Sequence, residues 1–259
     1  MQRKYFVKIE EAKNYKSAVE FIQAQGRPLY HGTASEFENY DTSKSGKGVG
    51  WSNQGNGIYL IDDNSSANMF ANVAKQNEIF SDSSLTAGEQ LAKVGLVTSG
   101  KITGIVKEYY LKAEAKILDI DNDLINKREA LNVLKEAGLD EKIMLSGNSW
   151  LEIIEESWKN KKSIPAKEII EQLQHSDKIK NSYEYLAKKL AYDGIKLPEQ
   201  RMATWDYWRQ EFGEFPKELP NTIIIYNIDK VLTKSQLTDI WTQANSNHSK
   251  AMLNTESIK

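Results

Sequence analysis

One segment near the end of the chain limits the possible folds more than any other. Residues 221–231, NTIIIYNIDKV, are rich in β-branched side chains and predict a buried strand. Further strand-like segments, at 28–33, at 57–62 and twice within 101–120, come before a long helical stretch. This order predicts an α+β fold in which a helical block at about 122–190 is inserted between strands of one sheet; the alternative is a separate helical subdomain.

Apolar residues at helical spacing predict the helices. The pattern is clear in residues 65–80, where Ala67, Phe70 and Ala71 share one face and Ser65 is the expected N-cap. We expect one domain over residues 1–244, followed by a flexible tail at 245–259. The other expected helices are 15–25, 123–137, 150–159, 166–190 and 235–244.

Composition excludes several classes of protein. The 259 residues carry 34 Lys and Arg against 36 Asp and Glu, which excludes a polycationic nucleic-acid coat and a basic membrane anchor. The absence of cysteine excludes disulfides, thiolate metal sites and a cysteine nucleophile. No run approaches the ~20 apolar residues of a membrane helix. The start, MQRKYFVKIEEAKNY, lacks the apolar core of a signal peptide, so we expect a cytoplasmic protein without membrane contact.

Common catalytic fingerprints are missing from the sequence. Gly46, Gly48 and Gly50 match neither the Rossmann glycine pattern nor the phosphate-binding P-loop, and no G-x-S-x-G elbow occurs. The three histidines lie far apart and there is no cysteine, so we expect no metal site of the zinc type; a carboxylate-only magnesium site is the alternative, because acidic residues are frequent. A short basic run at 159–162 favours the interpretation of a solvated helix end.

Two short motifs remain. Residues 29–33, LYHGT, place a tyrosine and a histidine at the end of a strand, directly before glycine. Residues 55–62, GNGIYLID, place two glycines before a strand with Tyr59 on one face and Ile58 and Leu60 on the other. Each motif alone is typical of ordinary structure: a packed histidine beside a tight turn, or a core strand that contains a tyrosine.

In this order and spacing, the two motifs resemble the ADP-ribosyltransferase superfamily. The resemblance is to its His–Tyr branch, which includes diphtheria-toxin-like, poly(ADP-ribose)-polymerase-like, bacterial and phage enzymes. It covers roughly 28–80, 101–120 and 191–232, and leaves the helical block unexplained. It implies a split pair of antiparallel sheets with NAD, the co-substrate, in the cleft between them.

The resemblance also implies roles for individual residues. His31 and Tyr59 would be catalytic: His31 would grip the nicotinamide ribose, and Tyr59 would stack on the nicotinamide ring. The backbone of Gly32 would bind the carboxamide, because glycine admits close approach. The full set of implied NAD contacts is Tyr30, His31, Gly32, Thr33, Gly57, Tyr59 and Thr222.

The chain departs from the family at one position. The last motif strand of the family usually begins with a glutamate, and Thr222 stands there instead. A hydroxyl cannot carry the charge that the glutamate supplies. We expect either that a carboxylate between Asp206 and Glu218 substitutes for it, with Glu218 as the candidate catalytic residue, or that the dipoles of the pocket act alone.

The stretch 199–218 lies where the family places its acceptor-recognising loop. It is rich in aromatic residues with interleaved arginines, a combination that suits an unpaired nucleic-acid base. The alternative is a hydrophobic lid packed on the inserted helices. The candidate acceptor-binding residues are Arg201, Trp205, Trp208 and Arg209.

The function implied by the resemblance is mono-ADP-ribosylation of a macromolecule, of a bacterial or phage, toxin- or effector-like kind. An RNA or DNA base is narrowly favoured over a protein side chain as the acceptor, and an antitoxin or inhibitor protein is a further possible partner. The alternatives are an NAD glycohydrolase, a non-catalytic NAD or ADP-ribose binding module, and an interaction domain that does not bind NAD.

Overall fold

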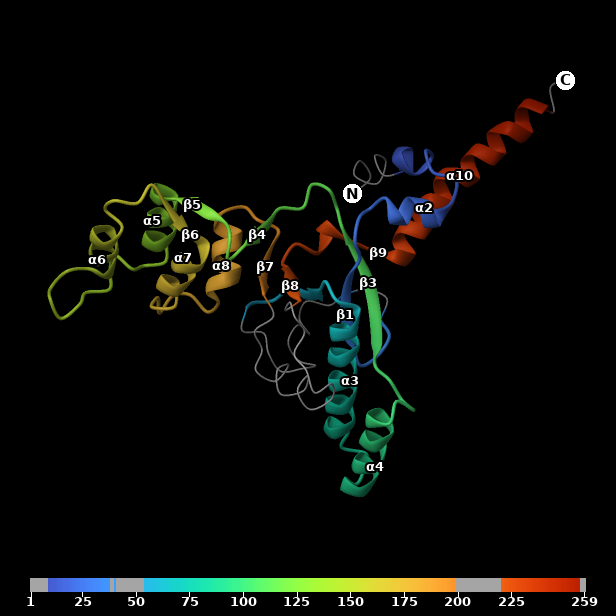
Figure 1. Ribbon diagram of the computed structural model, residues 1–259, viewed down its shortest axis with the longest axis horizontal. Coiled ribbons are helices and arrows are strands. Elements are labelled where there is room, and N and C mark those ends of the chain that lie inside the picture. Colours follow the sequence, from blue (N-terminus) through green and yellow to red (C-terminus); the bar gives the residue numbers. More distant parts are fainter. Residues whose placement is uncertain (1–8, 38–39, 41–53, 199–219, 257–259) are drawn as a thin grey trace.

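The computed structural model describes residues 9–37, 40, 54–198 and 220–256. Its centre is a seven-stranded mixed sheet with strand order β4-β7-β8-β2-β1-β3-β9, accompanied by a two-stranded β5-β6 sheet (Figure 1). The expected α+β class is confirmed. The strands are β1 Leu29–Thr33, β2 Ile58–Ile61, β3 Ile105–Leu111, β4 Ile117–Asp119, β5 Leu124–Asn126, β6 Ser163–Pro165, β7 Gly194–Pro198, β8 Asn221–Ile225 and β9 Val231–Thr233.

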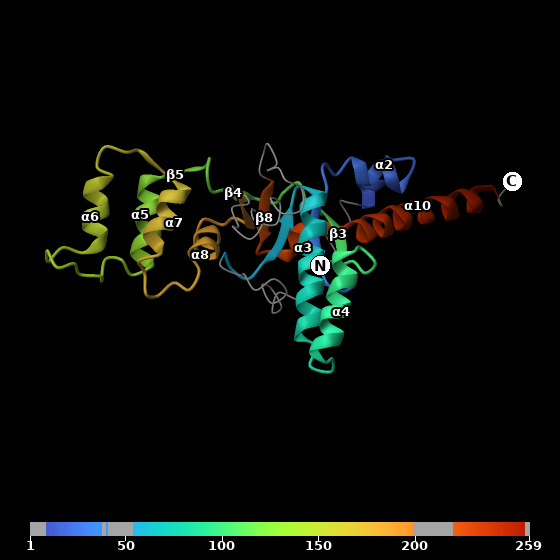
Figure 2. The same cartoon turned by 60° about the horizontal axis from the view of Figure 1, so that its bottom comes forward.

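Helices flank the sheet and extend the molecule in three directions. The inserted block, from β5 to α8, lies at one end of the long axis and α10 at the other, while α3 and α4 project between them (Figures 1 and 2). The helices are α2 Ala18–Gln23, α3 Asn64–Ser81, α4 Ala87–Thr98, α5 Lys127–Glu136, α6 Trp150–Ser157, α7 Ala166–Leu173, α8 Ser182–Lys189, α10 Lys234–Glu256 and the 3-10 turn η2 Ile228–Lys230.

Three helix predictions need correction. The segment 123–137 begins as strand β5, and its helix starts only after Asn126, whose side chain caps α5. The segment 166–190 forms two helices, because Asn181 caps a new helix by accepting a hydrogen bond from the Glu184 N–H. The cap of α3 is Asp63 rather than Ser65, and its carboxylate accepts from the Ser66 N–H at 2.6 Å.

Two further segments differ from the expectation. The run 221–231 supplies two strands: β8 lies inside the sheet, and after η2 the chain pairs with β3 at an edge as β9. The last helix continues to Glu256, past residue 245, where the flexible tail was expected to begin. Helix α4 was not predicted, although Thr86 and Glu89 form a capping box that marks its start.

The two faces of the sheet carry different apolar cores. Ile58 and Leu60 of β2 join a cluster with Ile223 and Ile225 of β8. Tyr59 packs instead against a larger cluster that the inserted helices build with Ile224 of β8. This confirms the predicted alternation along β2. The inserted block therefore shares its core with the strands at one end of the sheet.

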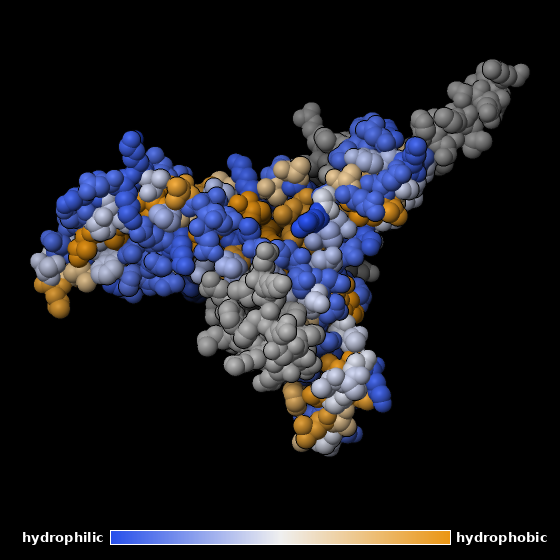
Figure 3. Space-filling model, in the orientation of Figure 1, coloured by the Kyte–Doolittle hydropathy of each residue, from blue (hydrophilic) through white to orange (hydrophobic). Residues whose placement is uncertain are grey.

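Exposed apolar side chains gather at the far end of the α3–α4 pair. Phe80 is 51% exposed and Leu91 is 64% exposed, and the hydrophobic surface is visible there in Figure 3. In the part of the chain that the structure describes, no helix has the length and apolar character needed to cross a bilayer.

Candidate functional site

The three segments singled out by the sequence form three neighbouring strands. β1 carries the LYHGT motif, β2 carries the tyrosine of GNGIYLID, and β8 begins the late β-branched run. β2 lies between the other two and is antiparallel to both. In the β2–β8 register, Tyr59 faces Ile224 and Ile61 faces Thr222. The fold therefore brings together motif segments that are far apart in the sequence.

β1 and β2 are neighbours but pair at a single position, Tyr30 with Ile61. By contrast, β1 pairs with β3 along its whole length, from Leu29 to Thr33. After Tyr30, a side-chain contact takes the place of backbone pairing between β1 and β2: the imidazole Nδ1 of His31 lies 2.9 Å from the Tyr59 carbonyl oxygen. A gap in the backbone pairing thus opens between the two motif strands.

The contact with Tyr59 fixes the tautomer of His31. A carbonyl oxygen can only accept a hydrogen bond, so Nδ1 must carry the proton. Burial is the largest influence on the ring and lowers its pKa; the Tyr59 carbonyl raises it, the positive charge of Lys107 lowers it, and the net shift is downward. At neutral pH the ring is therefore uncharged, and the lone pair of Nε2 is an acceptor.

Three aromatic rings also contact the His31 imidazole. Phe37, Tyr40 and Tyr109 meet the imidazole edge-on, with centroid separations of 6.0, 5.5 and 6.4 Å. Lys107 lies 3.9 Å above the Phe37 ring and pairs with Glu36 at 2.5 Å. These contacts hold the segment after β1 against the sheet and limit the rotation of the histidine.

Gly32 lies directly beneath α3. A Cβ atom at this position would be 2.2 Å from the Ala67 carbonyl oxygen and 2.6 Å from the Ala71 nitrogen, so only glycine fits. The Tyr59 carbonyl points toward β1, and so do the backbone groups of Ile61, because residues two apart on a strand direct their N–H and C=O to the same side. Tyr30 pairs with Ile61, so the backbone groups of Tyr30 point toward β2. Those of Gly32, two residues further along β1, point the same way, into the gap.

A residue that the sequence analysis missed lies at the start of α3. Ser66 is 0% exposed, and among the described residues its Oγ has no hydrogen-bond partner. It directly precedes Ala67, the residue whose carbonyl abuts Gly32. A buried hydroxyl left without a partner costs about 1–3 kcal/mol, so Ser66 is a candidate hydrogen-bonding group for a ligand. No sequence signal distinguishes Ser66 from its neighbour Ser65, since only burial does.

Tyr59 and Thr222 share the face of the sheet on which α3 covers Gly32. The Tyr59 hydroxyl donates to the Gly55 carbonyl at 2.9 Å, and its half-buried ring packs against the inserted helices. Thr222 is 3% exposed and lies between Ile61 of β2 and Leu197 of β7. Thr222, which the resemblance aligns with a glutamate, therefore occupies a buried strand position beside β2.

The remaining predicted contacts lie around the same strands. Tyr30 is half-buried opposite Glu108 of β3, and the Thr33 hydroxyl donates to the Ser35 carbonyl. The Gly57 carbonyl accepts from the Tyr40 hydroxyl at 2.9 Å. The acceptor candidates Arg201, Trp205, Trp208 and Arg209, together with Glu218 and the alternative carboxylates 206–214, lie outside the described residues.

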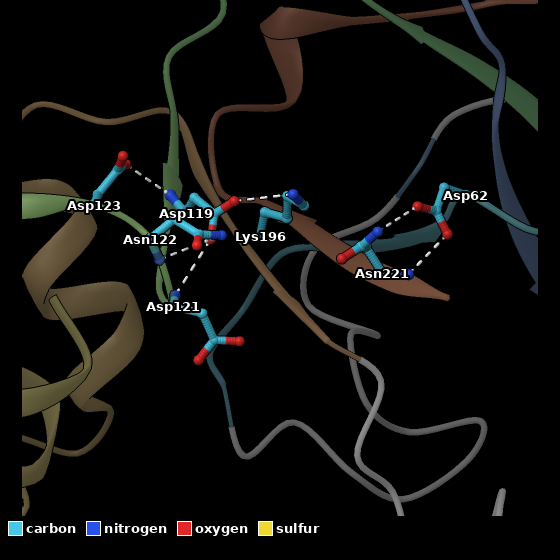
Figure 4. Close-up of polar contacts among 7 residues, drawn as sticks. All are labelled: Asp62, Asp119, Asp121, Asn122, Asp123, Lys196 and Asn221. Carbon is cyan, nitrogen blue, oxygen red and sulfur yellow. Dashed lines mark hydrogen bonds and ion pairs between the residues drawn. The ribbon is translucent and has the colours of Figure 1, made fainter. Parts of the chain in front are cut away.

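A carboxylate also lies beside the start of β8. Asp62 directly follows β2 and accepts two hydrogen bonds from Asn221, from its backbone N–H at 2.7 Å and its side-chain amide at 2.6 Å (Figure 4). On the next strand Lys196 pairs with Asp119 at 2.9 Å. Burial raises the pKa of Asp119, but Lys196 and Asn122 lower it by more. The first pair joins the end of β2 to β8, and the second joins β7 to β4.

No family model, curated protein or solved structure matches this sequence. Among the described residues, no group of three or more histidine or carboxylate side chains is placed to hold a metal ion. The interpretation of the site therefore depends on its own residues and geometry.

Proposed function

We propose that the gap between β1 and β2 binds the nicotinamide end of NAD and that the protein transfers ADP-ribose to a macromolecule. The observation that carries this proposal is the buried hydroxyl of Ser66, which has no partner among the described residues and belongs to the residue directly before Ala67, whose carbonyl abuts Gly32. A primary carboxamide offers both a donor and an acceptor. The N–H and C=O of Gly32 supply the matching pair, and Ser66 supplies a third hydrogen bond.

The other residues suit the remainder of the nicotinamide nucleoside. The neutral His31 offers Nε2 as the acceptor for a ribose hydroxyl. Tyr59 shares the face of Gly32 and offers an aromatic surface for the nicotinamide ring. The hydroxyl of Tyr59 is anchored on Gly55, which limits rotation of the ring. A preorganised set of this kind favours one orientation of the bond to be broken.

In the proposed reaction the bond between the ribose and the nicotinamide nitrogen breaks. Nicotinamide leaves with the bonding electron pair, the acceptor attacks the ribose carbon, and the acceptor releases a proton. A nucleic-acid base is the acceptor we favour over a protein side chain. With water as the acceptor, the same site would be a glycohydrolase.

A second candidate function is the binding of NAD or ADP-ribose without catalysis. Thr222 supports it, because a hydroxyl buried within the sheet provides no negative charge for the positive charge that develops on the ribose. This version predicts binding of NAD without release of nicotinamide.

The experiment that separates these functions uses NAD labelled in the adenosine part. The protein is incubated with the label and a cell extract, and free nicotinamide is measured in parallel. We expect label in the acid-insoluble fraction that nuclease removes. Label removed only by protease would identify a protein acceptor, release without incorporation would identify a glycohydrolase, and calorimetric binding without release would identify the non-catalytic module.

A further inference from the structure

Two pairs of basic residues from separate parts of the sequence meet in the inserted block. Lys127 and Arg128 begin α5, whereas Lys161 and Lys162 directly precede β6. β5 and β6 pair in antiparallel register, and the Lys127 N–H donates to the Lys162 carbonyl at 3.0 Å. The basic run that the sequence favoured as a solvated helix end is therefore one side of a larger basic surface.

This surface is hollowed into a groove of about 630 Å³. The groove has the size of small-ligand sites, which are commonly ~300–1,000 Å³. Its lining includes the half-buried Leu131 of α5 and Glu155 of α6. Its lining residues are Asn126, Lys127, Arg128, Leu131, Asn132, Glu155, Lys161 and Lys162.

The positive charges of the groove are only partly neutralised within the protein. The Lys161 ammonium pairs with Glu168 at 2.7 Å. The Lys127 ammonium donates to the Trp158 carbonyl at 2.8 Å, a contact that positions it without cancelling its charge. Among the described residues, Arg128 and Lys162 have no carboxylate within ion-pair distance. The groove therefore has an excess of positive charge in a chain whose net charge is -2.

We propose that this groove binds a strand of nucleic acid, with phosphates at Arg128 and Lys162 and a base against Leu131. Arginine and lysine are the usual partners of phosphate oxygens, and an apolar side chain can pack against the face of an unpaired base. The inference does not depend on NAD, because it uses neither the β1–β2 gap nor any residue near it.

The polar residues of the groove favour nucleic acid over an acidic peptide. The amides of Asn126 and Asn132 each offer a donor and an acceptor, and Glu155 offers acceptors. Base edges present both donors and acceptors, so they complement this set. The side chains of an acidic peptide present only acceptors, so they would leave the carboxylate of Glu155 without a donor.

Binding of a labelled twelve-nucleotide single-stranded RNA of mixed sequence, measured by fluorescence anisotropy across a salt series, tests the proposal. Arg128→Gln combined with Lys162→Gln should weaken binding at low salt at least tenfold. It should also flatten the slope of log affinity against log salt by about 1.4, since each phosphate contact on a single strand contributes about 0.7. The control Lys93→Gln with Lys101→Gln removes the same charge near α4, far from the groove (Figure 1), and should bind like the parent.

A second readout does not depend on the variants. In the parent protein, bound RNA should protect Lys162 from acetylation by a lysine-reactive ester, as measured by mass spectrometry, while Lys93 should stay reactive. The proposal is wrong if the parent does not bind the RNA, if the groove variant binds as the parent does, or if polyglutamate displaces the RNA at equal charge concentration.

Discussion

The Nδ1 atom of His31 donates a hydrogen bond to the Tyr59 carbonyl oxygen across 2.9 Å, in place of the backbone donor that a continuous ladder would supply. The register of the Tyr30–Ile61 pair sets Gly32 opposite Tyr59. The imidazole therefore shares the Tyr59 carbonyl, the acceptor that a regular antiparallel sheet would offer to the Gly32 N–H. One side chain thus links the two motif strands at the position where we propose that the Gly32 N–H meets a ligand.

Ser66→Ala should make the protein more stable and its binding of nicotinamide weaker. Removal of a buried hydroxyl without a partner should raise the free energy of unfolding by about 1 kcal/mol, while loss of its hydrogen bond should weaken nicotinamide binding about tenfold. Urea unfolding and calorimetry measure the two effects. The matched control is Ser149→Ala: Ser149 is also buried but caps α6, so this change should lower stability by about 1 kcal/mol and leave binding unchanged. Destabilisation by Ser66→Ala would show that the hydroxyl has a partner within the protein.

Gly32→Ala should disrupt the packing of α3 on β1. The new methyl group would meet the Ala67 carbonyl oxygen at 2.2 Å, so backbone must move, and we expect a loss of more than about 2 kcal/mol in the free energy of unfolding. Gly95→Ala in α4 is the control, since a Cβ there would meet no atom within 4 Å and the helix should gain about 0.5–1 kcal/mol. Equal stability of Gly32→Ala and the parent in thermal unfolding would contradict the close approach of α3.

Protonation of His31 should destabilise the protein at mildly acidic pH. Its folded pKa is below the ordinary value of 6.5, so the unfolded chain binds the proton more readily. The stability present above pH 6.5 should therefore fall as the pH drops below 6.5, until the folded pKa is passed. His31→Gln removes this titration. The stability difference between parent and variant, measured by urea unfolding at pH 7.5 and 5.5, should shrink at the lower pH; a constant difference would contradict a buried neutral ring.

Asp62→Ala should loosen the junction between β2 and β8. The change removes both hydrogen bonds to Asn221, one of them to a backbone N–H, and we expect a loss of about 1–3 kcal/mol in the free energy of unfolding. Asp121→Ala is the control, because within the described part of the chain the exposed carboxylate of Asp121 makes only a 4.0 Å pairing with Lys167 and should contribute less than about 0.5 kcal/mol. Equal effects of the two changes on chemical unfolding would show that the Asp62–Asn221 contact does not stabilise the sheet.

Local patterns predicted the strands of the candidate site but not their arrangement. The alternation around Tyr59 and the glycine after His31 located β2 and β1, because period-two burial is visible in the sequence. The orphaned hydroxyl of Ser66 depends on burial by distant segments, which no local pattern records. The basic groove likewise depends on the pairing of β5 with β6, two segments too short to predict. The division of 221–231 into β8 and β9 reflects tertiary pairing, which overrides a uniform β propensity.

The central claim is that the gap beside Gly32 and Ser66 recognises a carboxamide. Calorimetric titration of the parent protein with nicotinamide and, separately, with nicotinic acid tests it most directly. The two compounds share the ring, but the acid lacks the N–H donor that the Gly32 carbonyl requires, and it brings an uncompensated charge to a buried site. We expect measurable binding of nicotinamide and at least tenfold weaker binding of nicotinic acid. Equal affinities, or no binding of nicotinamide, would contradict the account.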